Sequence, residues 1–157
     1  MRNRSRRKIS LYIDTNVYDY VALRHPEFGQ PCKGLLDEVV KGTYVGYGSP
    51  LVAYEIFGSL SKVRSELAVG AVRAYYSMPI RIIDPERRTY EMADSIASLS
   101  GVTYDAVHAA IMMGAGVHSV ATEDVDDWMR IRDAWTDVAG SYGLEIADLV
   151  IARPTKL

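Results

Sequence analysis

The sequence predicts an α/β fold, a three-layer α/β/α sandwich with a central, mostly parallel sheet of four or five strands. Short apolar segments alternate with longer amphipathic ones along the chain, and turn residues separate them. Strands that alternate with helices are joined by helical crossovers, so the strands run parallel and helices cover both faces. At 157 residues the chain fits one domain whose core needs no disulfide or structural zinc.

The first half of the chain contains two of the expected strands. Residues 9–13 are apolar, and Asp14-Thr15-Asn16 directly after them is a helix-starting signal. Ser49-Pro50 supplies an N-cap and a first-turn residue, so a helix begins there. We therefore expect strands over 9–13 and 44–48, and helices over 33–41, 50–63 and 67–76.

The second half continues this alternation. Asp84-Pro85 provides the cap and first turn of one helix, and Thr103 can cap the next. Asp126 and Asp127 are expected to cap the last helix. We expect strands over 81–83 and 117–121, a fifth strand over 144–146, and helices over 85–99 and from 104 onward.

Charge divides the chain into a basic leader and an acidic body. Residues 1–8 carry five basic side chains and no acid, so they contribute +5 to a formal net charge of −2 and leave −7 on the rest. We expect residues 1–8 to be a leader and residues 9–157 to form a single domain. Two interpretations of the leader stay open: it contacts phosphates, or it is disordered and solubilising.

Composition favours a cytoplasmic protein. With 48% hydrophobic and 24% charged residues, the chain has an ordinary globular composition, and its apolar runs are too short for a membrane span. The apolar segment after the leader is too short and too interrupted for a signal peptide. The single cysteine, Cys32, cannot form an internal disulfide, and no Cys/His spacing predicts a zinc site.

Four carboxylates interrupt apolar segments: Asp14, Glu55, Asp105 and Asp124. An ionised carboxylate beside a core is costly unless a partner compensates it, so four of them indicate a shared cation. Each acid taken singly also has a structural explanation, such as a turn, a helix dipole or solvation. For all four together a cation is the better hypothesis, and oxygen ligands favour Mg²⁺ or Mn²⁺, as one or two ions.

The expected elements bring these acids to one edge of the sheet. Asp14 and Asp124 follow strands, while Glu55 and Asp105 lie in the N-terminal halves of helices. In a parallel α/β sheet both positions face the carboxyl ends of the strands, where ligands bind. A hard cation that keeps positions open for water and phosphate suits phosphodiester hydrolysis. The residues therefore predict a metal-dependent ribonuclease, in which Asp14 is the central ligand and Glu55 binds the metal or orients water.

Residues near the acids are candidates for supporting roles. Thr15 and Asn16 most simply cap the following helix, with a hydrogen bond to a metal ligand or phosphate as the alternative. His108 follows Asp105 by three residues on the same helix face, and we expect a packing histidine rather than the general base. The supporting candidates are Thr15, Asn16, Thr122, Asp126 and Asp127.

Four motifs follow one another along the chain in a specific order. They are Asp-Thr-Asn after an apolar strand (from Asp14), a helical Glu55, Asp-x-x-His-Ala-Ala (from Asp105), and Thr-x-Asp after a strand (Thr122 and Asp124). The set resembles the PIN-domain ribonucleases of the VapC toxin type. The resemblance implies a PIN-like α/β/α sandwich and a Mg²⁺- or Mn²⁺-dependent endonuclease that cuts RNA. It also implies a homodimer and a cognate antitoxin that blocks the site.

The chain departs from this family in two places. Members commonly show Thr-Asn-Asp-x-Asp-Phe after the fourth strand, whereas this chain has one extra residue there and Trp128 in place of Phe. The departure leaves open which of Asp124, Asp126 and Asp127 binds the metal. The second departure is the basic leader, because the family usually begins almost directly with the strand.

Two competing functions differ in the features they require. A phosphatase or phosphoacceptor with Asp14 as nucleophile needs a second Asp two residues later, where Asn16 stands, or paired acids before Asp14 and a late lysine. A catalytically silent RNA-binding or protein-interaction module on the same fold would show the loss of an acid, and all four are present. The identity of the RNA target has no readable code in the sequence.

Overall fold

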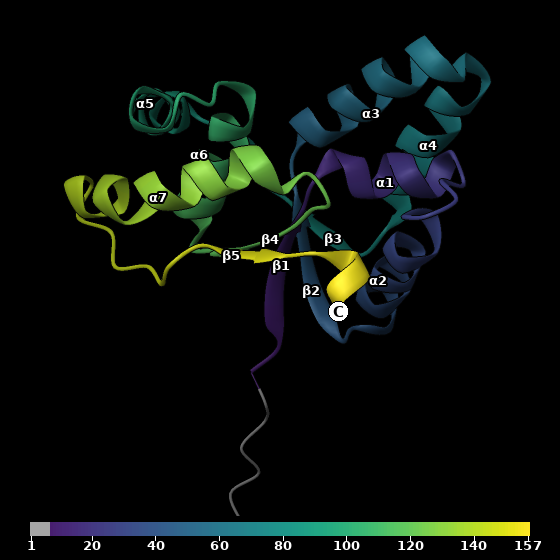
Figure 1. Cartoon of the computed structure of the whole chain (residues 1–157), viewed down its shortest axis with the longest axis horizontal. Coiled ribbons are helices and arrows are strands. Elements are labelled where there is room, and N and C mark those ends of the chain that lie inside the picture. Colours follow the sequence, from purple (N-terminus) through teal and green to yellow (C-terminus); the bar gives the residue numbers. More distant parts are fainter. Residues whose placement is uncertain (1–6) are drawn as a thin grey trace, which may run out of the picture.

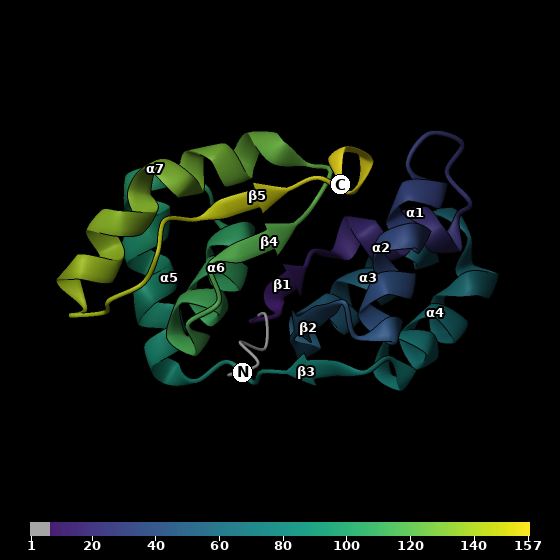
Figure 2. The same cartoon turned by 90° about the horizontal axis from the view of Figure 1, so that it is seen from below.

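The central sheet of the computed structural model, which describes residues 7–157, has five parallel strands in these residues. Their spatial order is β3-β2-β1-β4-β5 (Figure 2). Each neighbouring pair runs parallel. The strands are β1 (Ile9–Ile13), β2 (Tyr44–Gly48), β3 (Ile80–Ile82), β4 (Ser119–Ala121) and β5 (Val150–Ala152).

Two groups of helices enclose this sheet. Figure 1 shows α1 to α4 gathered on one side of the strands and α5 to α7 on the other, and helices pack mainly within their own group. The predicted three-layer α/β/α class is therefore confirmed. The helices are α1 (Thr15–Ala22), α2 (Gly29–Lys41), α3 (Pro50–Val63), α4 (Ser65–Ser77), α5 (Arg87–Ser100), α6 (Tyr104–Ala115) and α7 (Val125–Ser141), followed by a 3₁₀ turn, η1 (Pro154–Lys156).

The strand order reverses beside β1. The chain proceeds from β1 to β2 and β3 in one direction, then returns to place β4 on the other side of β1. The backbone N–H of Asp14 donates to the carbonyl of Ala121 at 3.0 Å, so the carboxyl ends of β1 and β4 lie side by side. A crevice outside such a switch point is where α/β sheets bind ligands.

The core explains why β1 and α6 are so apolar. Leu11, Tyr12 and Ile13 of β1 are buried because helices cover both faces of the central strand. Seven residues of α6 are buried, so few positions of this helix are left to face solvent. Trp128 and Trp135 of α7 are among the largest fully buried side chains.

The fifth strand is correct in existence and wrong in position. Residues 144–146 carry no strand pairing, and β5 forms instead at Val150–Ala152 against β4. Leu144 and Ile146 are half-buried against the core from a loop, with the N–H of Leu144 donating to the carbonyl of Ala139. Their apolar character therefore reflects packing of a connection rather than a ladder of hydrogen bonds.

Helix starts show three further differences from expectation. α5 begins at Arg87 rather than at Pro85, because Glu86 and Thr89 form a reciprocal capping box there. Ser49 and Thr103 occupy the expected N-cap positions, but neither side chain makes a capping hydrogen bond. The expected bounds of β1, β2 and α3 match the observed ones, and the other expected bounds differ by up to four residues, as helix ends and short strands commonly do.

Most of the basic leader lies outside the described residues, which begin at Arg7. Within residues 7–157 no helix is both long and apolar enough to cross a membrane. Cys32 is buried, and burial raises the pKa of its thiol to about 12, so the thiol stays protonated near neutral pH.

Gly48 ends β2 where the ring of Tyr75 packs. A Cβ at Gly48 would lie 2.1 Å from the Tyr75 hydroxyl oxygen, which bonds both the N–H and the C=O of Ser49 at 3.0 Å. Gly48→Ala is expected to lower the free energy of unfolding by about 1–3 kcal/mol because Tyr75 must move. Urea unfolding measures this. In Gly58→Ala the new Cβ meets nothing within 4 Å, so this control should be neutral or more stable, and equal losses would contradict the packing argument.

Candidate metal centre

Asp14 stands at the carboxyl end of β1 and caps α1. Its Oδ1 accepts from the backbone N–H of Thr15 at 2.8 Å. Its Oδ2 accepts from Asn16 Nδ2 at 3.1 Å, from the Thr122 hydroxyl at 2.9 Å and from Trp128 Nε1 at 3.0 Å. The side chain is buried, so these four donors hold the carboxylate in one orientation at the switch point.

Thr15 and Asn16 do not cap α1 with their side chains, because Asp14 itself fills that role. The Thr15 hydroxyl donates to Glu55 Oε1 at 2.9 Å. Asn16 bonds both Asp14 and the Thr122 hydroxyl, and its Oδ1 accepts from the N–H of Glu123 at 3.1 Å. Thr15 and Asn16 therefore bond Glu55 and Asp14, and a role beside metal ligands stays a prediction for both.

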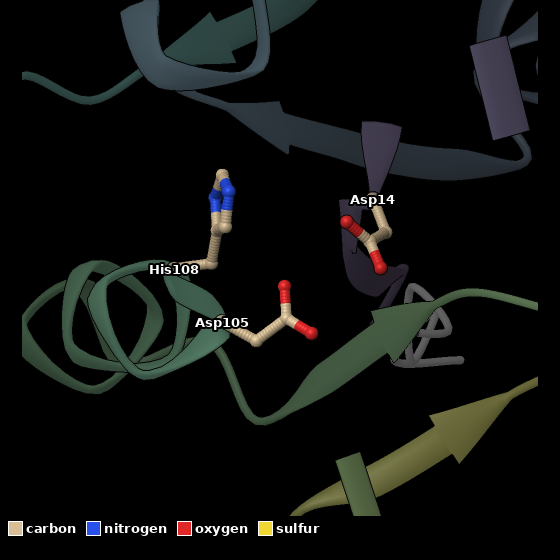
Figure 3. A group of neighbouring side chains, drawn as sticks. All are labelled: Asp14, Asp105 and His108. Atoms are coloured by element: carbon tan, nitrogen blue, oxygen red, sulfur yellow. The ribbon is translucent and has the colours of Figure 1, made fainter. Parts of the chain in front are cut away.

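Asp105 lies in the first turn of α6 and faces Asp14. Figure 3 shows Asp105 and His108 projecting from α6 toward Asp14 at the end of β1. One potential ligand atom from each of these three residues lies within 4.8 Å of the others. Within residues 7–157 the Asp105 carboxylate accepts no hydrogen bond from any side chain or backbone group. Burial, followed by the charge of Asp14, raises its pKa to about 7.

Glu55 reaches the same cluster from α3. Its Oε1 accepts from His108 Nε2 at 2.5 Å and from the Thr15 hydroxyl. Burial alone would raise the pKa of Glu55, but the hydrogen bond and charge of His108 outweigh it and lower the pKa. His108 is buried and its Nδ1 bonds Tyr12, which agrees with the expected packing role but adds a direct contact to a candidate ligand.

The role of Asp124 at the site stays a prediction. Asp124 occupies the N-cap position of α7 and is exposed, and it is absent from the close group of Asp14, Asp105 and His108. Burial and the charges of Asp127, Asp14 and Asp126 raise its pKa, so it shares their electrostatic field. Asp126 and Asp127 lie in the first turn of α7 rather than at its cap, and Asp127 pairs with Arg130 at 2.5 Å.

Glu123 follows Thr122 in the loop after β4. Its side chain is completely buried and accepts from Arg153 Nη2 at 3.0 Å and from the backbone N–H of Thr155 at 2.8 Å. Glu123 therefore ties the C-terminal turn to the loop that carries Thr122. Arg153 and the N–H of Thr155 compensate the charge of Glu123 inside the protein, so Glu123 is a structural group rather than a candidate ligand.

Sequence reasoning missed two hydrogen bonds that orient side chains of the site. Trp128 was noted only as a replacement for Phe, yet its indole donates to Asp14. Tyr12 lies in an apolar strand, where nothing in the pattern indicates that its hydroxyl meets His108. For His108 a signal did exist, since residues three apart share a helix face.

The residues present fit a hard divalent cation. Asp105 has a partly buried carboxylate with no protein donor in the described chain, beside Asp14 and near Glu55, and such crowding is costly unless a cation compensates it. The donor set consists mainly of carboxylate oxygens, which Mg²⁺ and Mn²⁺ prefer. The fold and these acids define an α/β/α protein with a candidate cation site at the switch point of its sheet.

Comparison with solved structures gives the particular fold. The chain is similar to VapBC2 from Rickettsia felis, solved with promoter DNA (TM-score 0.63, 16% identity, 92% of this chain and 98% of that one). It is similar to Mycobacterium tuberculosis VapC20, a sarcin-ricin loop cleaving toxin (0.65, 18%, 76% and 93%), and to DNA-bound VapBC from Salmonella typhimurium (0.62, 15%, 93% and 98%). No protein-family model matches the chain, and no curated protein matches it in sequence. The chain has the fold of the VapC-type PIN domains.

Proposed function

We propose that this protein is a Mg²⁺- or Mn²⁺-dependent endoribonuclease, the toxin of a toxin–antitoxin pair. The observation that carries the proposal is the juxtaposition of Asp14 and Asp105, with Glu55 beside them, at the switch point of the sheet. Burial and the charge of Asp14 raise the pKa of Asp105 to about 7, and a perturbed acid beside a second acid is typical of functional sites. The fold shared with VapC toxins favours RNA cleavage over other phosphoryl chemistry.

Asp14 and Asp105 are the residues that would hold the cation. Glu55 would ligate it or orient water through Oε2, because Oε1 is already bonded to two donors. Asp124 and Asp127 would complete the site from the start of α7. A bound Mg²⁺ or Mn²⁺ supplies an activated water and compensates charge on the phosphate. The protein contributes orientation, since Thr15, Thr122 and Trp128 fix the carboxylates in advance.

The experiment is cleavage of structured RNAs by metal-stripped protein with and without Mn²⁺. The panel includes a sarcin-ricin loop hairpin, because that is the RNA named for the M. tuberculosis neighbour. We expect cuts that require Mn²⁺ and disappear in Asp14→Asn. An absence of cutting with every metal, while RNA still binds, would contradict the proposal and favour the catalytically silent module.

Tyr104 is proposed as a stacking surface for an unpaired base. It is 83% exposed at the start of α6 and lines a shallow pocket of about 360 Å³ with Asp105, Asp127 and Arg130. In an Asp14→Asn background, Tyr104→Ala is expected to weaken binding of single-stranded RNA by about 1–3 kcal/mol. Fluorescence anisotropy measures the affinity.

The control for this prediction is Tyr90→Ala. Tyr90 is 51% exposed on α5 and lines no part of the pocket beside Asp105. Its removal should leave RNA affinity unchanged. Equal affinities for the Tyr104 and Tyr90 variants would remove Tyr104 from the RNA-binding surface.

We further propose an antitoxin as partner. Two of the structural neighbours are VapBC complexes, and this chain has a groove of about 360 Å³ between α1 and α4 that is lined almost entirely by apolar side chains. The candidate partner is the product of a small neighbouring reading frame, and co-expression should give an inactive complex. Ala71→Arg in the groove should prevent that complex while leaving RNA cleavage intact.

We also propose that the protein is a homodimer and that it acts in the cytoplasm. Light scattering tests the dimer.

A further inference from the structure

A continuous chain of hydrogen bonds crosses the core and ends at the candidate site. The Ser49 hydroxyl bonds the Tyr12 hydroxyl at 2.8 Å, and Tyr12 bonds His108 Nδ1 at 2.7 Å. On the other side of the ring, His108 Nε2 bonds Glu55 Oε1 at 2.5 Å, and Thr15 bonds the same oxygen at 2.9 Å. The chain joins β1, the start of α3 and α6 in one polar path.

Because this chain of hydrogen bonds is buried, each of its polar groups needs a partner. His108 is 1% exposed, while Tyr12 and Ser49 are 0% exposed. A buried polar group without a partner costs free energy, so each member constrains the orientation of the next. Tyr75 fixes the far end, because its hydroxyl bonds the backbone N–H and C=O of Ser49. The imidazole therefore has little freedom to rotate.

The direction of the bond to Glu55 follows from the groups involved. An ionised carboxylate can only accept, so His108 Nε2 carries the proton whether the ring is neutral or charged. Nδ1 is occupied by Tyr12 in both cases, as acceptor or as donor. Neither nitrogen has a lone pair free for a cation, although His108 lies within 4.8 Å of the Asp14 and Asp105 oxygens.

We propose that His108 is a positioning residue that holds Glu55 in place for the cation, and that it is not a metal ligand. This inference rests on the proposed function. Glu55 is 35% exposed in its side chain, so without this bond it would sample several rotamers in water. The bonds from His108 and Thr15 fix Oε1 and leave Oε2 with no donor from residues 7–157. Oε2 is then the oxygen available to the cation or its water.

Three variants separate positioning from simple core packing. His108→Leu keeps an apolar side chain of similar size but removes the donor. His108→Gln keeps an N–H donor near the position of Nε2, and Tyr12→Phe removes only the partner of Nδ1. Calorimetric titration of Mn²⁺ into folded, metal-stripped protein measures affinity, alongside RNA cleavage. We expect His108→Leu to bind Mn²⁺ about tenfold or more weakly, and His108→Gln to come within about threefold of wild type.

A spectroscopic measurement on the wild-type protein tests the same idea without any variant. Nitrogen-15 NMR of the histidine rings should show a slowly exchanging Nε2–H on His108 in metal-free protein. That signal should persist when Mg²⁺ is added at saturating concentration. Its loss on adding Mg²⁺ would mean that His108 ligates the metal, and the inference would be overturned even if His108→Leu fails to fold.

Failure of this inference can be told apart from failure of the proposed function. If wild type binds Mn²⁺ but cuts no RNA, the nuclease proposal fails and the Mn²⁺ affinities of the variants still decide the role of His108. If wild type cuts RNA and folded His108→Leu binds Mn²⁺ and cuts equally well, positioning by His108 is wrong and the nuclease proposal stands.

Discussion

Asp105→Asn is expected to make the metal-free protein more stable at pH 8 while abolishing metal-dependent RNA cleavage. Burial and the charge of Asp14 raise the pKa of Asp105 to about 7, and the charge of His108 offsets this only in part. At pH 8 the folded protein therefore holds a carboxylate that would be better solvated in the unfolded chain. A shift from 3.8 to about 7 corresponds to at most about 4 kcal/mol, and we expect a gain of about 2 kcal/mol because the side chain is not fully shielded from water.

The pH dependence of this gain has a definite sign. The folded-state pKa of Asp105 lies above the unfolded-state pKa. At pH values between these two pKa values the folded state therefore binds more protons than the unfolded state. The penalty is absent below pH 4, grows as pH rises toward 7, and is complete above 7. Urea unfolding in the presence of a chelator should therefore show a smaller advantage for Asp105→Asn at pH 5 than at pH 8.

The control is Asp133→Asn, which removes an exposed acid from α7. It should change stability little at either pH and leave RNA cleavage intact. Cleavage by Asp105→Asn should fall by about 10³-fold or more, as expected when a group that stabilises the transition state is removed. An Asp105→Asn protein that is less stable at pH 8, or that still cuts RNA, would contradict our assignment of this residue.

Trp128→Phe is expected to have the second large effect, although Phe is the common residue there in the family that the sequence resembles. Trp128 is fully buried, and its indole N–H donates to Asp14 Oδ2 at 3.0 Å. Phe leaves a cavity and removes a hydrogen bond to a charged group. We expect the free energy of unfolding to fall by about 3 kcal/mol and Mn²⁺ affinity to fall about tenfold.

Trp135→Phe is the matched control for this prediction. Trp135 is also fully buried in α7, and its indole donates to the carbonyl of Ala147 at 3.0 Å, away from the acids. The variant should lose about 2 kcal/mol of stability but keep wild-type Mn²⁺ affinity. If both tryptophan variants lose metal affinity equally, the effect comes from general loosening and not from the bond to Asp14.

The fold could be predicted because its main signals are local. The apolar strand 9–13 and the cap at Ser49-Pro50 depend on neighbours in the sequence, and both elements formed at the expected residues. The fifth strand could not be placed in this way. Residues 144–146 and 150–152 are both short and apolar, and only pairing with β4 distinguishes a strand from a packed loop.

The candidate site could be predicted as a set of acids but not as a network. Residue spacing brought Asp14 and Asp105 to one edge, and the structure places them together. The bonds from Trp128 to Asp14 and from His108 to Glu55 join residues 114 and 53 positions apart, so no local pattern reports them. Whether Asp124 joins the site stays a prediction, because it lies at the N-cap of α7 outside the close group and yet the charge of Asp14 contributes to raising its pKa.

The measurement that tests the central claim most directly is the melting temperature of metal-stripped protein as Mn²⁺ is added to millimolar concentration. If the acids form a cation site, Mn²⁺ binds the folded state and raises the melting temperature of wild type. The same addition should not raise the melting temperature of Asp105→Asn. An unchanged melting temperature for wild type, or an equal rise for Asp105→Asn, would contradict a cation site at this edge of the sheet.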